Sequence, residues 1–358
     1  MKKILSAIMA VALAATAFAG CGKKDDANGN NGGKTVVFIP KLTGNAFFES
    51  ANVGAQEHAK KVGYTVKYDG NAEASVANQV TIINNAIQQG ADAICVSSVD
   101  ATGLDSALKE ARKAGIKVVT WDSDVSGDAR SLMVSQGTPE QLGKMLVDMS
   151  VESLKERGKD PEKDAIKYAW HYSQATVADQ NSWQVAGEKY IKEKYPNWKN
   201  VAPSNYYSEQ DAEKAISVGE SIFSAHKDID LVICNDSTAL PGTLQAMQNM
   251  NKKANDVTVT GFASPNSIKD YCKAGIITRW GLWDCKIQGA LGCYLANYLA
   301  QGNKVKVGDK IDVPEIGIVE VLPNTVLDPN AYTADDSGVV LLPERAVFTK
   351  DNVDNYNF

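Results

Sequence analysis

The sequence predicts an α/β protein of two lobes, each built on a parallel sheet flanked by helices. Short apolar runs, typical of buried strands, alternate with longer amphipathic segments, typical of helices. The alternation runs once up to about residue 124 and again from about residue 139. About a dozen such units are too many for one open sheet, so two similar lobes are the economical interpretation.

The first series begins with a buried strand at Val36–Pro40 and a helix whose apolar residues recur with a period near 3.6. The helices in this series stop at a glycine, a residue that adopts the left-handed conformation common at helix ends. In order, the remaining predicted segments are a strand at 65–70, a helix from Val76 to Gly90, a strand at Ala93–Ser98, a helix at Leu104–Ala114 and a strand at Lys117–Asp124.

The second series follows the segment Ser131–Gln136 and opens on a long amphipathic helix that starts at Pro139. Proline is favoured in the first turn of a helix, because its missing N–H is not needed there. The predicted helices are Pro139–Arg157, Ala178–Tyr195, Ala212–Ala225, Ala239–Met250 and Lys286–Ala300. The predicted strands are Ala165–Ser173, Ser204–Ser208, Leu231–Asp236, Val257–Phe262 and Gly275–Asp284.

The N-terminus has the features of an export signal. Lys2 and Lys3 precede the apolar run Ile4–Phe18, which is too short to span a membrane and leads to small residues before Cys21. This ending resembles a bacterial lipobox, which implies that residues 1–20 are removed and that Cys21 carries a lipid. Residues 21–34 are rich in Gly, Asn and charge, and we expect them to form a flexible tether.

Composition and cysteine usage exclude several classes of protein. A chain of 358 residues with 44% hydrophobic and 22% charged residues is ordinary for a globular protein. Its net charge of −6 and the lack of a basic run argue against nucleic-acid binding. Besides Cys21 there are five cysteines without CxxC spacing, and the three histidines are not spaced with a second ligand, so we expect no metal site and no cofactor.

Polar and aromatic residues gather where predicted strands end. Lys117–Asp124 ends in Trp121 and Asp122, and in open α/β sheets ligands bind at the carboxyl ends of the strands. Three other stretches repeat this arrangement: Lys41–Phe48, Ala178–Asn181 and Asn235–Ser237. Together they predict a cleft with a cation, carboxylates, amides and aromatic faces, which suits a small neutral polyhydroxylated ligand.

Each of these residues also has a purely structural interpretation. Asp122, Asp179 and Asp236 could each cap the following helix, and Lys41 could be solvated. Phe47 and Phe48 lie on the apolar stripe of their helix and could belong to the core. The prediction of a binding cleft therefore depends on the four stretches occurring together.

Several of these motifs resemble one known family. FIPKLTGNAFF, TWDSD, TVADQNSW, ALPGTLQAM and GLWD, in this order, are similar to the type I periplasmic sugar-binding proteins of ABC transporters. The likeness runs from about Val36 to the C-terminus and is greatest to the branch that contains autoinducer-2 receptors and rhamnose-binding proteins. It implies two Rossmann-like lobes joined by three crossings of the chain, which close over the ligand like a hinge.

The resemblance also implies lobe boundaries. The first lobe is expected to comprise residues 35–137 plus about 282–312, and the second residues 138–281 plus about 313–358. The expected crossings are Gln136–Pro139, the neighbourhood of Phe262–Pro265 or Trp280–Trp283, and a third within Gln301–Pro314.

Carried over by position, the resemblance assigns autoinducer-2 contacts to Lys41, Asp122, Asp179 and Gln180. Asn235 and Ser237 flank Asp236 where autoinducer-2 receptors have Pro and Ala. The pair Asn235 and Asp236 is instead similar to that of sugar-binding relatives, in which the Asn contacts a sugar hydroxyl. The full set of expected ligand-binding residues is Lys41, Phe47, Phe48, Trp121, Asp122, Asp179, Gln180, Asn235, Asp236, Ser237 and Trp283. Autoinducer-2 and a sugar such as rhamnose or ribose both remain open as the ligand.

The expected function is capture of this ligand outside the cytoplasm, by a lipid-anchored monomer that delivers it to an ABC permease. A chemoreceptor or sensor is a second partner that the same fold permits. An enzyme in which Asp122 and Asp179 hydrolyse a glycoside is a weaker alternative. A dinucleotide-dependent oxidoreductase is weaker still, because no G-x-G-x-x-G follows the first strand. We therefore expect no catalytic residues.

Overall fold

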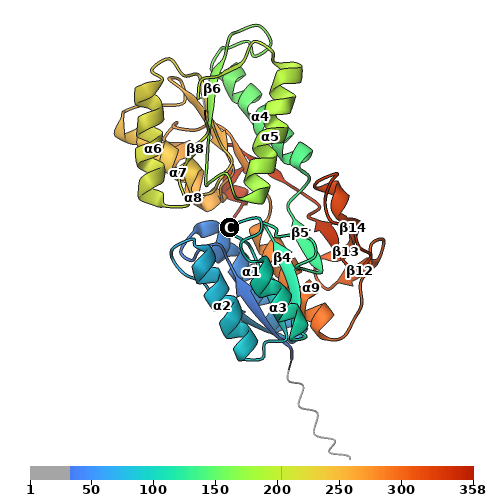
Figure 1. The fold of residues 1–358 in the computed structure, drawn as a ribbon. Helices are drawn as coiled ribbons and strands as arrows, with labels where there is room; N and C mark the ends of the chain where they lie inside the picture. The colour runs from blue at the N-terminus through green and yellow to red at the C-terminus, as the bar shows by residue number, and fades with distance from the viewer. Residues whose placement is uncertain (1–32, 203) are drawn as a thin grey trace, which may run out of the picture. The chain divides into compact units, whose positions relative to one another are not determined.

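The structure is a computed structural model that describes residues 33–202 and 204–358. Within these residues the chain forms two α/β lobes (Figure 1). The predicted signal, Cys21 and most of the predicted tether lie outside the described residues.

The first lobe is organised around a seven-stranded sheet in the order β14-β15-β5-β4-β3-β1-β2. All neighbours in this sheet are parallel except the pair β14 and β15. Its strands are β1 (Thr35–Ile39), β2 (Thr65–Tyr68), β3 (Ala93–Val96), β4 (Lys117–Trp121), β5 (Leu132–Ser135), β14 (Leu322–Pro323) and β15 (Gly338–Leu341). The central strands are buried on both faces, which is why they read as continuous apolar runs.

Helices cover both faces of this sheet. On one face α1 (Ala46–Val62) packs against α9 (Cys285–Ala300), and on the other lie α2 (Val76–Gln88) and α3 (Asp105–Lys113). Alternate residues of each strand supply the two cores: Phe38 packs toward α1, and Ile39 packs toward α2 and α3.

The second lobe repeats the plan with a sheet in the order β10-β9-β6-β7, in which β8 also pairs with β6. These strands are β6 (Lys167–Tyr172), β7 (Lys199–Asn200), β8 (Tyr206–Tyr207), β9 (Leu231–Cys234) and β10 (Thr258–Gly261). Helices α4 (Pro139–Glu156) and α5 (Ala178–Lys194) lie on one side, opposite α6 (Ala212–Ala225) and α7 (Ala239–Asn249), as Figure 1 shows. The helix α8 (Pro265–Lys273) follows β10.

The chain passes between the lobes at three places. It leaves the first lobe between β5 and α4, returns between β11 (Trp280–Leu282) and α9, and leaves again between β15 and β16 (Ala346–Phe348). β11 pairs with β16 and joins the second lobe through a bridge between Phe262 and Gly281.

The third crossing differs from the prediction. It lies between β15 and β16, not within Gln301–Pro314, because β15 continues the first sheet beside β5. The hairpin of β12 (Lys310–Val313) and β13 (Gly317–Glu320) and the short turn η1 (Asn324–Val326) precede it. The placement of residues 313–341 in the second lobe was therefore wrong, and only the last segment, with β16 and η2 (Val353–Asn355), belongs there.

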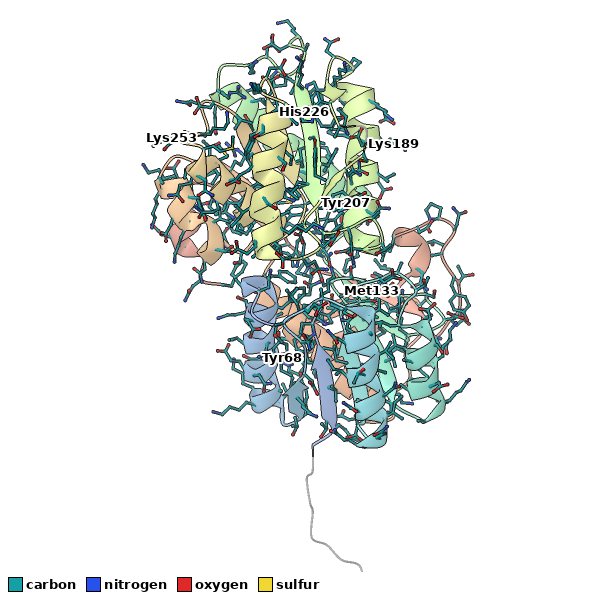
Figure 2. All side chains as sticks on the ribbon, turned by 60° about the vertical axis from the view of Figure 1, so that its left-hand side comes forward. Tyr68, Met133, Lys189, Tyr207, His226 and Lys253 are labelled. Atoms are coloured by element: carbon teal, nitrogen blue, oxygen red, sulfur yellow. The ribbon has the colours of Figure 1, made fainter. Side chains whose placement is uncertain are left out.

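Side chains occupy the space between the facing ends of the two lobes, as Figure 2 shows. Among the described residues no helix is both long and apolar enough to cross a membrane. The same residues contain five cysteines, all buried and free: Cys95, Cys234, Cys272, Cys285 and Cys293.

Candidate functional site

Three charged side chains from both lobes meet between the sheets. The Nζ of Lys41 lies 3.0 Å from Oδ2 of Asp122 and 3.6 Å from Oδ1 of Asp179. All three side chains are at most 8% exposed. Lys41 and Asp122 come from the first lobe and Asp179 from the second, so this charged trio joins the lobes.

The ends of secondary structure position this trio. Lys41 follows β1 and Asp122 follows β4, at the carboxyl edge of the first sheet, while Asp179 lies in the first turn of α5. Asp122 has a φ of 60°, a left-handed conformation that few residues other than glycine, Asn and Asp adopt readily. Its Oδ2 accepts a hydrogen bond of 2.7 Å from the Ser97 hydroxyl.

Burial and mutual attraction set the protonation of the trio. Burial alone would lower the pKa of Lys41, but the carboxylates of Asp122 and Asp179 outweigh it and raise that pKa above its ordinary value. Burial raises the pKa of Asp179 to about 6, against the opposing attraction of Lys41. The Ser123 hydroxyl and the Gln136 side-chain amide both donate to Asp179. A buried cation between two carboxylates is compatible with binding hydroxyl groups.

The second carboxylate of the TWDSD motif has a structural role instead. Asp124 accepts two hydrogen bonds from Arg130, at 2.9 Å from Nε and 2.6 Å from Nη2. Nη1 of Arg130 donates to the carbonyl of Gly338 on β15. This pair, in which Arg130 is buried, ties the loop after β4 to the start of β15.

The second lobe contributes a network of amides and a carboxylate. Gln180 Nε2 donates to Oδ2 of Asp236 at 3.0 Å, and Gln180 Oε1 accepts from the backbone N–H of Ser173 at 3.1 Å. Oδ1 of Asp236 accepts from the backbone N–H groups of Thr238 and Ala239 at the start of α7. Asn235 Nδ2 donates to the carbonyl of Gln180 at 2.7 Å. Burial raises the pKa of Asp236.

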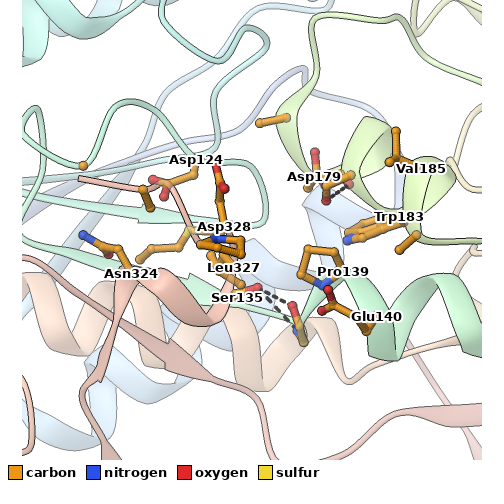
Figure 3. A pocket seen from close by; sticks show the side chains of 18 of the residues that line it. Asp124, Ser135, Pro139, Glu140, Asp179, Trp183, Val185, Asn324, Leu327 and Asp328 are labelled. Carbon is orange, nitrogen blue, oxygen red and sulfur yellow. Dashed lines mark hydrogen bonds between the residues drawn. The ribbon is translucent and has the colours of Figure 1, made fainter. Parts of the chain in front are cut away.

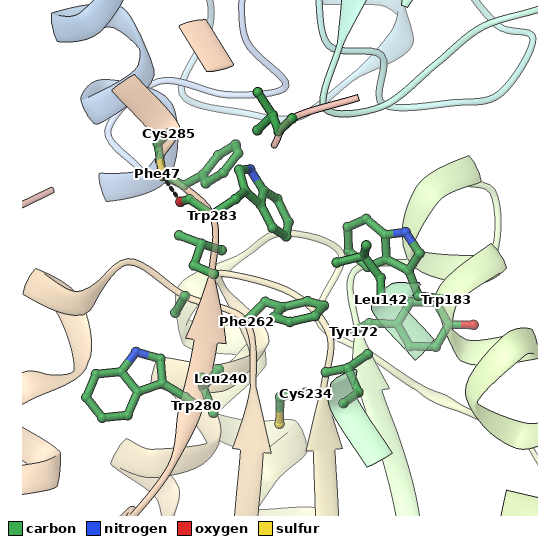
Figure 4. Packing of buried hydrophobic residues seen from close by; sticks show 14 of the residues in the cluster. Phe47, Leu142, Tyr172, Trp183, Cys234, Leu240, Phe262, Trp280, Trp283 and Cys285 are labelled. Atoms are coloured by element: carbon green, nitrogen blue, oxygen red, sulfur yellow. Dashed lines mark hydrogen bonds between the residues drawn. The ribbon is translucent and has the colours of Figure 1, made fainter. Parts of the chain in front are cut away.

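Aromatic rings from both lobes enclose the charged groups. Trp283 lies between Phe47 and Phe262, with ring centroids 5.9 Å and 5.5 Å apart, and Trp183 of α5 packs 5.8 Å from Trp283 (Figure 4). Phe48 packs edge-on against Phe47. These rings form an apolar wall that excludes water from the hydrogen bonds beside it.

Trp121 departs from its predicted place. It is fully buried; its ring stacks against Phe47 at 6.1 Å and packs at a tilt against Phe38 at 4.6 Å. As the last residue of β4 it points toward the face covered by α1 and α9, away from the cleft. The expectation that Trp121 presents its ring to a ligand is therefore corrected: Trp121 supports Phe47.

The other predicted residues line one small cavity of about 20 Å³, roughly the size of a single water molecule. They are Lys41, Phe47, Phe48, Asp122, Asp179, Gln180, Asn235, Asp236, Ser237 and Trp283. A larger cavity of about 770 Å³ lies beside it and shares Asp122, Asp179 and Trp183 (Figure 3). Two members of the trio, Asp122 and Asp179, therefore lie where the small cavity meets a ligand-sized space, whereas Lys41 lines only the small cavity.

Four residues of the small cavity were missed: Trp183, Gln210, Phe262 and Leu282. Trp183 lies one helical turn after Asp179, so helical spacing alone could have indicated it. Gln210 lies two residues after the predicted strand Ser204–Ser208, so the argument from strand ends could have found it. Phe262 comes directly after β10, and Leu282 is the last residue of β11.

Within residues 33–202 and 204–358 no group of His, Cys, Asp and Glu side chains has the arrangement of a metal site. The carboxylates of Asp122 and Asp179 each form an ion pair with the ammonium group of Lys41 instead. The arrangement is that of a polar and aromatic cavity.

Comparisons with known proteins identify the family of the chain. Residues 36–304 match the family described as periplasmic binding protein domain. The structure of LsrB from Clostridium saccharobutylicum in complex with AI-2 is 70% identical, with a TM-score of 0.90, and the match covers 90% of this chain and 100% of that chain. A solute-binding protein from Clostridium phytofermentas with bound L-rhamnose is 21% identical with a TM-score of 0.80, covering 90% and 98%, and shows a shared fold. The ribose import binding protein of Salmonella typhimurium is 28% identical over 87% of this chain and 97% of its own length.

Proposed function

The chain belongs to the periplasmic binding protein domain family, and from this premise we propose that it captures autoinducer-2 between its lobes for an ABC importer. The observation that carries the proposal is the 70% identity to a protein whose structure contains AI-2, a match that spans all of that protein. The family is one of solute-binding proteins, which places the protein outside the cytoplasm.

The charged trio supports a ligand with several hydroxyl groups. Burying an unpaired hydroxyl costs roughly 1 to 3 kcal/mol, so each hydroxyl of a small cyclic polyol must find a partner. In our proposal Asp122 and Asp179 accept from hydroxyls, and Lys41 donates to a ring or hydroxyl oxygen. Phe47 and Trp283 cover the apolar face of the ring. The ligand enters through the larger cavity, which adjoins both carboxylates.

A sugar is the second candidate ligand. By the resemblance given above, Asn235 and Ser237 are polar where autoinducer-2 receptors have Pro and Ala. The relatives at lower identity include proteins named for ribose and L-rhamnose. A five- or six-membered sugar ring would use the same carboxylates and the Asn235 amide.

Glycoside hydrolysis is less well supported than binding. An acid catalyst needs a carboxyl group that is protonated and free to approach the glycosidic oxygen. Lys41 instead pairs with both Asp122 and Asp179, an arrangement that favours holding hydroxyls over donating a proton.

The deciding experiment identifies the ligand that the protein carries from cells. The protein is purified from cells that make autoinducer-2, denatured, and the released small molecule is assayed with an autoinducer-2 reporter strain. We expect activity in this release and none from protein made in a strain without the autoinducer-2 synthase. An inactive release, together with tight titration by ribose or rhamnose, would replace autoinducer-2 with the sugar.

We also propose that Cys21 anchors the mature protein to the outer face of the cytoplasmic membrane as a monomer, where it meets the ABC permease or a chemoreceptor. The support is the charged start, the apolar run and the small residues before Cys21. With the native signal, the wild type should fractionate with membranes and carry the mass of a lipid, whereas Cys21→Ala should lose both. Membrane association of Cys21→Ala without added lipid mass would contradict the anchor.

A further inference from the structure

Gln210 lies in the small cavity but has no place in the expected ligand set. It lies between β8 and α6, is 6% exposed and lines the cavity together with the trio. Its Nε2 is buried and has no hydrogen-bond partner among the described residues. A buried donor without a partner is costly, and in a binding cavity it is available to a ligand.

The backbone holds Gln210 in a conformation that must be stabilised by its surroundings. Glu209 and Gln210 have φ values of 53° and 59°, so two successive residues other than glycine are left-handed. The Ser208 hydroxyl accepts from the N–H of Gln210, and the N–H of Glu209 donates to the carbonyl of Ser173 at 2.8 Å. These bonds fix the loop so that Gln210 lines the cavity.

A free acceptor from the same lobe lines the same cavity. Asn235 is fully buried, and its Nδ2 donates to the carbonyl of Gln180. This bond fixes the orientation of the amide, so the group without a partner is the Oδ1 acceptor. Gln180, in contrast, is already engaged by Asp236 and Ser173. The second lobe thus offers one free donor, from Gln210, and one free acceptor, from Asn235.

We propose that Gln210 is a specificity-determining residue that donates from Nε2 to a hydroxyl oxygen of the ligand, while Asn235 Oδ1 accepts from a hydroxyl. The inference rests on the proposed function and extends it, because it assigns the second lobe's recognition of the ligand to Gln210. A hydroxyl is the group that can accept from one amide and donate to another. Ligands with adjacent hydroxyls satisfy both atoms, and ligands without them leave both buried and unpaired.

The test compares Gln210→Met with Glu209→Met by titration calorimetry with autoinducer-2, and with ribose and rhamnose as further probes. Methionine keeps the length of Gln210 but removes the donor. Glu209 has the same backbone conformation but is exposed and pairs with Lys214, so its substitution is a matched control. We expect Gln210→Met to weaken binding about tenfold, as for one lost hydrogen bond, and Glu209→Met to remain within about twofold of the wild type.

Binding of the probe by the wild type separates this inference from the proposed function. If the wild type binds a probe and Gln210→Met binds it within twofold of the wild type, Gln210 does not contact the ligand and the inference is wrong. If the wild type binds none of the probes, the proposed function fails first, and the inference falls with it. Should Gln210→Met not fold, Gln210→Glu replaces it: this variant keeps the shape but exchanges the donor for an acceptor, and we expect the same loss.

Discussion

Lys41, Asp122 and Asp179 depend on one another for their charges. Removing one carboxylate leaves a buried ammonium with a single partner, and an uncompensated buried charge is more costly than the lost attraction. The trio should therefore respond to substitution as a unit.

Asp122→Asn is the substitution that isolates charge from shape. Asparagine adopts the left-handed conformation of Asp122 readily, so the backbone is retained. The side chain becomes a weaker acceptor for Lys41 and, in our proposal, for the ligand hydroxyls. We expect the dissociation constant to rise more than about tenfold, a loss of ~1.4 kcal/mol. Asp148→Asn, which disrupts an exposed ion pair with Lys144, is the control and should leave affinity unchanged. Equal affinities of Asp122→Asn and the wild type by calorimetry would exclude Asp122 as a ligand contact.

Ligand binding should depend on pH through Asp179. Burial raises the pKa of Asp179 to about 6, so below that pH a proton must leave before the carboxylate can accept from ligand hydroxyls. Affinity should be constant above pH 6 and fall as pH decreases below it, by at most about tenfold per pH unit for one proton. Calorimetry between pH 5 and pH 8 measures this. The inflection should vanish in Asp179→Asn, and an affinity that does not change down to pH 5 would show that the carboxylate need not be ionised.

The sequence predicted most of the cavity because its residues follow strands of clear pattern. Asp122 and Asn235 come directly after apolar runs, and their location needs only the rule that ligands bind at the carboxyl ends of strands. The ring orientation of Trp121 was not predictable in this way, because both sheet faces are buried and an aromatic residue suits either. Gln210 was missed because its position depends on a strained loop held by contacts distant in sequence.

At the scale of elements, helices with a strong apolar period were predicted well, and short strands near the C-terminus were not. β12, β13 and β15 have only four residues each, which is too short for a clear periodic pattern. In addition, Ile318 in the β12–β13 hairpin is 73% exposed, so an apolar residue does not mark a buried position there. Whether β15 joins the first or the second sheet is decided by pairing with β5, which no local pattern encodes.

The contact between α1 and α9 depends on glycine. A Cβ on Gly289 would lie 2.1 Å from the carbonyl oxygen of Ala51, and one on Gly54 would lie 2.2 Å from that of Lys286. These contacts are to backbone, which cannot rotate away, so the two helices can only move apart. The sequence alone did not show that α9, after crossing back, would pack so closely on α1.

We predict that Gly289→Ala lowers the free energy of unfolding by about 1–3 kcal/mol through overpacking, although alanine is the better helix former. Denaturation in urea, followed by tryptophan fluorescence, measures the change. Val53→Ala, at an exposed position of α1, is the control and should stay within about 0.5 kcal/mol of the wild type. A midpoint for Gly289→Ala at or above that of the wild type would mean that the helices separate without cost.

At the scale of the whole molecule, polar contacts away from the trio also join the two lobes within residues 33–202 and 204–358. Asn45 Nδ2 donates to the Thr238 hydroxyl at 3.2 Å, and Gln174 Nε2 donates to the carbonyl of Val99 at 3.1 Å. The N–H of Ala101 donates to the carbonyl of Thr176. Each such bond contributes only about 0.5 to 1.5 kcal/mol net, so a few of them can be broken and remade by ligand binding.

The last prediction is that the lobes open and close about the three crossings. A cavity of about 20 Å³ cannot hold a five-membered ring, so we expect the ligand-free lobes to open in solution before the ligand passes from the larger cavity to the trio. The ligand then adds contacts to both lobes, and these favour closure. A ligand that binds both lobes favours the closed state in proportion to those added contacts. Small-angle scattering of ligand-free and saturated protein should therefore show a smaller radius of gyration with ligand. Asp122→Asn, at the ligand concentration that saturates the wild type, should keep the larger radius. If the wild-type profile is the same with and without ligand, the cleft is rigid, and the ligand must instead enter by movement of side chains around Lys41.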